Sequence, residues 1–205
     1  MGTRNLTCVY LDGEYKIAQY GQWDGYPEGQ GMTCLKFLKD EMVLPVFKEQ
    51  LRSVRPIDEK AMMRIFKAFG GSEDGSIACK DHDRLKEVFP KFHRDTGAKI
   101  LKMVQNDELL SKYVETRLEF AADSLWCEWC YVIDLDKNTF EVYQGYNTRP
   151  LTEEDRFFFL RNEEDSEYAD SKGNHYHGVK LIKLYNLNNL PTEDEFIADF
   201  KEDEE

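Results

Sequence analysis

The sequence contains no uninterrupted apolar run that approaches the roughly 20 residues a membrane-spanning helix requires. Its opening stretch, MGTRNLTC, lacks the charged and then apolar pattern of a secretory signal peptide. The five cysteines are an odd number, and without a secretion signal we interpret them as reduced thiols rather than as a disulfide framework. We therefore expect a cytoplasmic protein that does not associate with membranes.

The sequence has fewer basic than acidic residues. The chain has 27 lysines and arginines against 40 aspartates and glutamates, which gives a net charge of −13. A field of this sign repels the phosphates of nucleic acids, so general DNA or RNA binding is disfavoured. The acidic stretches leave two uses open, which are mimicry of DNA and inhibition of a partner protein through an acidic surface. We expect residues 201–205, at the acidic end, to be disordered.

The familiar motifs of phosphate and metal chemistry are missing or incomplete. Neither a GxGxxG motif nor a Walker lysine is present, which excludes the ordinary dinucleotide and P-loop sites. Cys127 and Cys130 form one CxxC pair, which could be redox-active or half of a zinc site. His175 and His177 would be the other half, but no second CxxC exists, and positions three apart in a strand face opposite sides. We therefore expect buried free thiols here and assign no metal ligand.

Two nucleophilic or acid–base patterns are also weak. Residues 95–98, Asp-Thr-Gly-Ala, have the letters of an aspartic-protease loop, but they follow a polar stretch and lack a paired second aspartate, so we predict the start of a helix. An N-terminal-nucleophile hydrolase remains an alternative because a hairpin near the N-terminus suits that class. However, loss of Met1 exposes Gly2, which has no nucleophile, and Thr3 would need further processing. We assign no catalytic residue and no cofactor.

The chain has 205 residues, 41% of them apolar and 13% aromatic, which suits one domain with its own core. Residues 6–20 predict a β-hairpin around the Asp12-Gly13 turn. A second hairpin is expected at residues 126–135 and 139–143, and a further strand at 179–187. Helical patterns fill the middle and recur near the end, at residues 32–38, 47–54, 59–69, 100–104, 107–117, 152–160 and 192–200, with Thr152 expected to cap the helix at 152–160. We predict a single α+β domain, residues 1–205, in which N-terminal and C-terminal hairpins form an antiparallel sheet beside a helical middle.

Residues 20–31, YGQWDGYPEGQG, carry the strongest functional signal. Gly29 and Gly31 let the backbone approach a ligand, and Thr33 offers a hydroxyl at the start of the following helix. Unpaired N–H groups at a helix start attract anions. Arg4 on the first strand could reach the same region. This combination favours a site for an anionic group.

The aromatic residues of the same stretch could hold a planar ring by stacking, and an aspartate there could accept hydrogen bonds from it. The alternative is that the stretch is an ordinary turn whose aromatic residues belong to the core. Our candidate ligand-binding residues are Arg4, Tyr20, Gln22, Trp23, Asp24, Tyr26, Gly29, Gly31 and Thr33.

Residues 2–4, Gly-Thr-Arg, and residues 16–31 resemble a family of mostly uncharacterised bacterial and phage proteins that begin with GTR and carry a Q-[YW]-D-[GS]-Y-P-x-G loop. The Trp-x-Tyr-Val-Ile-Asp-Leu-Asp stretch near residue 130 is also similar to theirs. The resemblance touches both ends of the chain and supplies no established activity. Its phage association implies a role in the contest between phage and host defence.

These observations together favour a non-enzymatic protein that sequesters a small anionic ligand, such as a nucleotide signal of antiphage defence. Analogy with small phage ligand traps adds the expectation of a homo-oligomer. The negative net charge opposes anion capture unless Arg4, Lys16 and helix dipoles dominate locally. Two alternatives remain. One is a hydrolase or nucleotide-modifying enzyme that uses Asp24 or Glu28 as its base, and the other is the acidic inhibitor of a partner protein.

Overall fold

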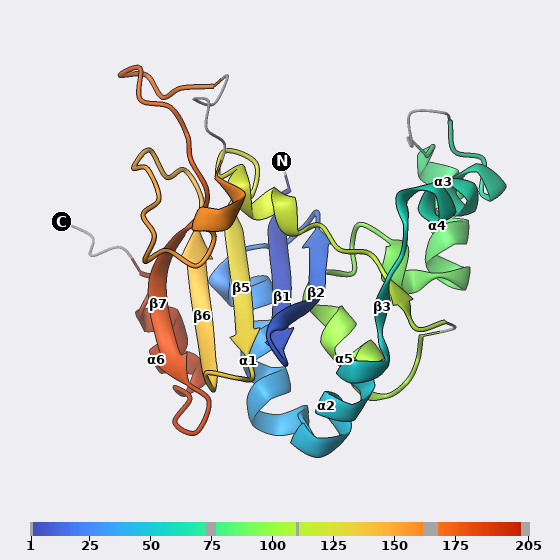
Figure 1. The fold of residues 1–205 in the computed structure, drawn as a ribbon, viewed down its shortest axis with the longest axis horizontal. Coiled ribbons are helices and arrows are strands. Elements are labelled where there is room, and N and C mark those ends of the chain that lie inside the picture. The colour runs from blue at the N-terminus through green and yellow to red at the C-terminus, as the bar shows by residue number, and fades with distance from the viewer. Residues whose placement is uncertain (1, 73–76, 110, 162–167, 202–205) are drawn as a thin grey trace.

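A mixed five-stranded sheet with the strand order β2-β1-β5-β6-β7 organises the protein (Figure 1). The computed structural model describes residues 2–72, 77–109, 111–161 and 168–201. The predicted α+β class is confirmed. None of the helices in these ranges is long and apolar enough to cross a membrane. Of the tail predicted to be disordered, residues 202–205 lie outside the described residues.

The N-terminal hairpin forms as predicted, from β1 (Asn5–Leu11) and β2 (Glu14–Gly21). Its two-residue turn consists of Asp12 and Gly13, whose φ angles are 54° and 81°. This left-handed conformation matches the twist of the flanking strands, which is why the Asp-Gly pair predicts the turn well.

The second hairpin consists of β5 (Trp129–Asp134) and β6 (Thr139–Gln144), and β7 (Lys180–Asn186) extends it. The two hairpins meet because β1 pairs with β5, and this pairing is parallel. The sheet is therefore mixed rather than wholly antiparallel. A parallel pair needs a long crossover, and the whole helical middle of the chain supplies it.

One face of the sheet is covered by α1 (Met32–Lys36), α2 (Leu44–Ser53), α5 (Ile100–Gln105) and α6 (Glu193–Ala198) (Figure 1). The main core lies between these helices and the strands. Its largest fully buried side chains include Phe47, Tyr131, Phe140 and Phe196. Loops cover part of the opposite face, near the N-terminal end of β1.

Two further helices, α3 (Glu59–Ala68) and α4 (Cys79–Val88), lie beyond the β2 edge of the sheet (Figure 1). The first was expected, and Asp58 caps it by accepting a hydrogen bond of 2.8 Å from the N–H of Ala61. The second was not predicted from the sequence. Its amphipathic pattern is weaker because charged residues dominate its sequence.

The prediction of a helix at residues 107–117 is wrong. Asp107 has a φ of 56°, which ends α5, and β4 (Tyr113–Val114) pairs in parallel with β3 (Arg55–Pro56). The apolar spacing that suggested a helix included Leu110, which lies outside the described residues. The prediction of a helix at residues 152–160, with Thr152 as its cap, is also wrong, because the structure has only a short 3₁₀ turn there, Phe158–Leu160. Asp155 accepts the N–H and hydroxyl of Thr152, so this cap closes a turn instead of starting an α-helix.

Lys91 is buried beside this region, with 2% of its surface exposed. Its Nζ donates to the carbonyl and the hydroxyl oxygen of Ser111, at 2.6 and 2.8 Å. Burial, aided by Lys112, lowers the pKa of Lys91 from 10.5 to about 8. Keeping the Lys91 ammonium group charged in the folded protein therefore costs free energy.

This shift predicts a stability that rises with pH. Between pH 8 and 10.5 the folded chain has lost the Lys91 proton while the unfolded chain keeps it, so unfolding takes up a proton and becomes less favourable as the pH increases. Relative to Lys91→Met, the wild type is expected to gain about 1–2 kcal/mol across this range. Urea unfolding at several pH values measures the difference. The exposed Lys99→Met serves as control, and parallel stability curves for wild type and Lys91→Met would contradict the shifted pKa.

Candidate ligand-binding site

The loop of residues 20–31 packs tightly against β1 and β5. The N–H of Gly25 donates to the Thr3 carbonyl at 2.9 Å, and the Tyr131 hydroxyl donates to the Gly25 carbonyl at 2.7 Å. A Cβ on Gly25 would lie 2.6 Å from the Thr3 carbonyl oxygen, and one on Gly31 would lie 2.9 Å from the Tyr131 ring. These glycines therefore permit close packing within the protein.

The N–H groups at the helix start, predicted to face an anion, donate to the loop itself. Those of residues 29–31 bind the carbonyls of Asp24 and Tyr26, at 2.8–3.4 Å. The Thr33 hydroxyl donates to the Gly29 carbonyl at 3.0 Å. The groups that the sequence assigned to an anion are thus paired within the chain.

Arg4 lies beside this loop but binds elsewhere. Its guanidinium forms an ion pair of 3.1 Å with Glu128 and lies 4.4 Å from the ring centre of Trp126. The predicted stacking residues Trp23 and Tyr26 are 44% and 54% exposed. Both side chains therefore lie on the surface of the protein.

Tyr20 lies on a different side of the structure, in the wall of a cavity of about 600 Å³. The cavity lies where β2, the α3–α4 pair and the segment after β4 come together. Rings and guanidinium groups form much of its wall, namely Tyr20, Phe66, Phe92, Phe120, Arg94 and Arg117. The rings of Tyr20 and Phe120 meet edge to face with centres 5.2 Å apart. We call this the Tyr20 cavity.

Positive charge converges on the Tyr20 hydroxyl. Burial raises the pKa of Tyr20, and Arg4, Arg94 and Arg117 each oppose that rise, so all three guanidiniums lie within electrostatic reach of the phenol. The hydroxyl itself donates to Gln22 Oε1 at 2.6 Å. Two residues of the predicted site, Tyr20 and Gln22, are therefore joined here, with Arg4 nearby.

The three arginines differ in how far their charge is already neutralised. Arg4 is paired with Glu128, and Arg117 with Glu115. Arg94 forms no ion pair with any residue that the structure describes. Its guanidinium is therefore the cation best placed to bind an anionic group. Two exposed carboxylates, Glu119 and Asp123, also line the cavity and limit how much negative charge it can accept.

Two histidines complete the wall. The rings of His82 and His93 meet edge to face, 5.5 Å apart, and burial lowers the pKa of both. His93 Nδ1 accepts the N–H of Asp95 at 3.1 Å, so its proton is on Nε2 in the neutral form. Near pH 7 the pair is neutral and can exchange hydrogen bonds without adding charge.

The cavity wall also contains hydrogen-bonding capacity that the described residues do not use. Gln19 lines the cavity and is 1% exposed, and its Nε2 donates to the Tyr20 carbonyl at 3.2 Å. Its Oε1, like His82 Nδ1, has no hydrogen-bond partner among the described residues. Buried acceptors are normally paired, so these two atoms identify this wall as one suited to a polar ligand.

Sequence reasoning missed Arg94, Arg117, His82 and His93. They come from three separate segments, and none belongs to a motif with a fixed spacing. The adjacent His93 and Arg94 were the one local hint. Tyr20 was found because its loop is unusual, although the loop's other candidates Trp23, Asp24, Tyr26, Gly29, Gly31 and Thr33 do not line the cavity.

Cys127 and Cys130 are buried in an apolar cluster with Cys8. Burial raises the pKa of both thiols well above the ordinary value, which leaves them protonated and unreactive. Within the described ranges, no three His, Cys, Asp or Glu side chains are grouped so that they could hold a metal ion.

Comparison with known proteins gives no relative. No family model, no curated protein and no solved structure matches the chain.

Proposed function

We propose that the protein binds a small anionic ligand with a planar ring, of the nucleotide class, in the Tyr20 cavity. One observation carries this proposal: a cavity of about 600 Å³ combines aromatic walls with two arginines, Arg94 and Arg117, in its lining. Rings of this kind stack on a base, and guanidinium groups bind phosphate through paired N–H donors. Cavities of this volume hold ligands of nucleotide size.

The positions of the charged and aromatic residues favour one orientation of the ligand in the cavity. Arg94 and Arg117 would bind its anionic end, and the ring would lie against Tyr20 and Phe120. The net charge of −13 repels anions at long range, but salt screens that field over about 8 Å. Contacts inside the cavity are screened less. A nucleotide signal of host defence belongs to this chemical class, and the family resemblance implies a role in the contest between phage and host.

Sequestration fits the cavity better than turnover. Hydrolysis needs a base and a nucleophile in hydrogen-bonding distance of each other. The acid–base candidates in the wall are the His82 and His93 pair and the carboxylates of Glu115, Glu119 and Asp123. His93 Nδ1 is already bound to the Asp95 N–H, and no hydroxyl or thiol nucleophile besides Tyr20 lines the cavity among the described residues. The experiment below therefore also tests whether the ligand is turned over.

Nucleotide binding is tested by calorimetry with AMP and with cyclic mononucleotides and dinucleotides. We expect Arg94→Met to weaken binding about 10- to 100-fold, because a hydrogen bond to a charged group contributes about 1.5–3 kcal/mol. The matched control Arg84→Met removes the same charge from α4 outside the cavity and should change affinity little.

Two further readouts separate the alternatives. Nucleotide released by heating the complex should be chemically intact, whereas altered nucleotide would replace the binder by an enzyme. If no nucleotide binds, or if Arg84→Met weakens binding as much as Arg94→Met, the proposed site is wrong. An inhibitor of a partner protein would then become the better hypothesis.

A further inference from the structure

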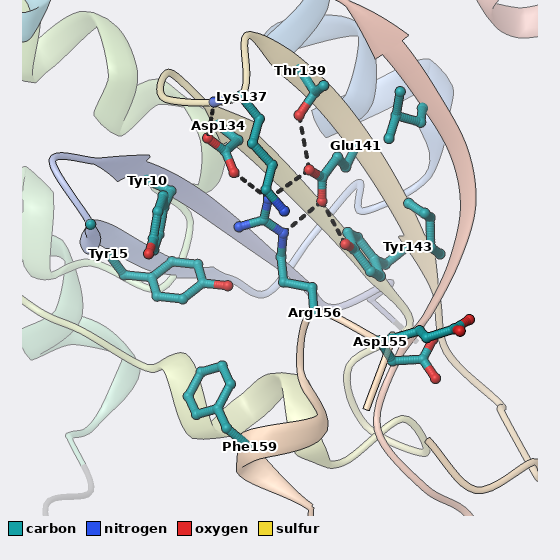
Figure 2. A pocket seen from close by; sticks show the side chains of 14 residues that line it. Tyr10, Tyr15, Asp134, Lys137, Thr139, Glu141, Tyr143, Asp155, Arg156 and Phe159 are labelled. Atoms are coloured by element: carbon teal, nitrogen blue, oxygen red, sulfur yellow. Dashed lines mark hydrogen bonds and ion pairs between the residues drawn. The ribbon is translucent and has the colours of Figure 1, made fainter. Parts of the chain in front are cut away.

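The sheet face opposite the helices is only half covered, and the uncovered half forms a second cavity of about 650 Å³ (Figures 1 and 2). Toward one end, apolar side chains such as Cys8 and Val132 pack under the loop segment that carries Phe157. Side chains two positions apart in a strand lie on the same face. On this face, Tyr10 therefore follows Cys8 in β1, and Asp134 follows Val132 in β5. The pattern thus changes from apolar to charged and aromatic where the covering loops end.

Arg156 lies at the centre of this cavity, between two buried carboxylates (Figure 2). Its Nη2 donates both to Asp134 and to Oε1 of Glu141, the latter at 2.7 Å. Its Nε donates to Oε2 of Glu141, also at 2.7 Å. The carboxylates are held from their other sides as well. Glu141 accepts the hydroxyls of Thr139 and Tyr143, at 2.9 and 2.5 Å.

Two carboxylates on one guanidinium leave an excess negative charge in the cavity floor. The lining as a whole has four carboxylates against two cations, which are Asp134, Glu141, Glu154 and Asp155 against Lys137 and Arg156. Arg156 directs Nε and Nη2 to the carboxylates of the floor, and the surrounding field is negative. An anionic ligand is therefore disfavoured here.

Aromatic rings form the side of the cavity next to Arg156 (Figure 2). Tyr10 and Tyr15 meet edge to face at 5.0 Å, and Phe159 lies 6.4 Å from Tyr15 and is 59% exposed. The guanidinium carbon of Arg156 lies 5.5 Å from the ring centre of Tyr10. Arg156 thus already forms a cation–π contact with the ring of Tyr10.

We propose that this second cavity binds a small organic cation of the quaternary-ammonium or alkylamine class. Faces of aromatic rings attract such cations, and a surplus of carboxylates adds a favourable field. The cation would lie against Phe159 and Tyr15, in the field of the lining carboxylates, of which Glu154 is exposed. This site is independent of the nucleotide site proposed above, since it is formed by different residues and selects the opposite charge.

The test uses choline and its uncharged isostere 3,3-dimethylbutan-1-ol, which replaces the ammonium nitrogen by carbon. Titration of the full chain followed by two-dimensional NMR should give saturable shifts for choline at cavity residues such as Phe159 and Leu184. The isostere should bind at least about tenfold more weakly, because it fills the same space without the charge. Equal binding of the two compounds, or shifts confined to other regions, would overturn the proposal, as would the absence of saturable binding.

Two variants with matched controls locate the cation. Phe159→Leu and Glu154→Gln change exposed side chains, so folding should be retained, and each should weaken choline binding about two- to fivefold. Tyr113→Leu removes an exposed aromatic ring and Glu49→Gln an exposed carboxylate charge outside the cavity, and both should leave the affinity unchanged. Equal effects in variants and controls would refute this location.

Discussion

Replacing Arg156 with methionine is expected to lower the free energy of unfolding by about 3–5 kcal/mol, because it leaves two buried carboxylates without their cation. The side chains of Asp134 and Glu141 are 0% and 5% exposed, and that of Arg156 is 12% exposed, so water can replace little of the lost interaction. In a chain of this length each kcal/mol lowers the unfolding midpoint by about 2–4 °C. Thermal unfolding monitored by circular dichroism measures the loss.

The pH dependence of this loss identifies its cause. Burial raises the pKa of Asp134, and in the wild type Arg156 and the N–H groups of Lys137 and Asp136 together outweigh that effect and hold the pKa below its ordinary value. In Arg156→Met the burial and the two N–H groups remain and the cation is gone, so the folded-state pKa of Asp134 should be higher than in the wild type. The deficit should therefore be largest at neutral pH and shrink as the pH falls and the carboxylates take up protons.

A surface variant provides the comparison. Arg52 pairs with Asp12 in an exposed ion pair, and both side chains are about half exposed. Arg52→Met should leave the midpoint nearly unchanged at every pH, since solvent and salt screen such pairs. If both variants lose the same stability, or if the deficit of Arg156→Met does not vary with pH, the buried charges are not its origin.

Local signals in the sequence predicted local structure well. Asp12-Gly13 defines a tight turn, and Thr192 with Glu195 forms a capping box at the start of α6. Each depends on residues at most three positions apart, so the sequence contains the whole interaction. The same holds for the Asp58 cap of α3.

Interactions between distant segments could not be predicted in this way. Arg4 was expected to reach the loop of residues 20–31, but Glu128, 124 positions along the chain, binds it. The parallel pairing of β1 with β5 places these two residues side by side, because Asn5 is opposite Trp129. A composition or spacing pattern does not contain that register. Arg156 and its two carboxylates were missed for the same reason.

The error at residues 107–117 has a different cause. Tyr113 and Val114 follow Leu110 in the sequence at the three- and four-residue spacing of a helix. However, the backbone at Asp107 adopts a left-handed conformation, and this ends the helix. Val114 is then buried as part of a two-residue strand beside β3. Tertiary pairing overrode a local apolar pattern that fitted either structure.

Gly29→Ala is expected to destabilise the protein by about 3 kcal/mol, because the new Cβ would lie 2.1 Å from the carbonyl oxygen of Asp24. That carbonyl accepts the N–H of Gln30 at 2.8 Å, so moving it to relieve the clash would also disturb the start of the helical segment. Both atoms in the clash belong to the backbone, which cannot move aside as a flexible side chain can. Chemical unfolding measures the loss.

The matched control is Gly173→Ala, where a Cβ has no atom within 4 Å but φ is 84°. Its cost of about 1 kcal/mol comes from the left-handed backbone alone. A larger loss at Gly29 than at Gly173 shows that close packing inside the loop requires this glycine. If Gly29→Ala instead keeps full stability and loses only nucleotide binding, the glycine serves ligand approach, and the ligand site includes this loop as well as the Tyr20 cavity.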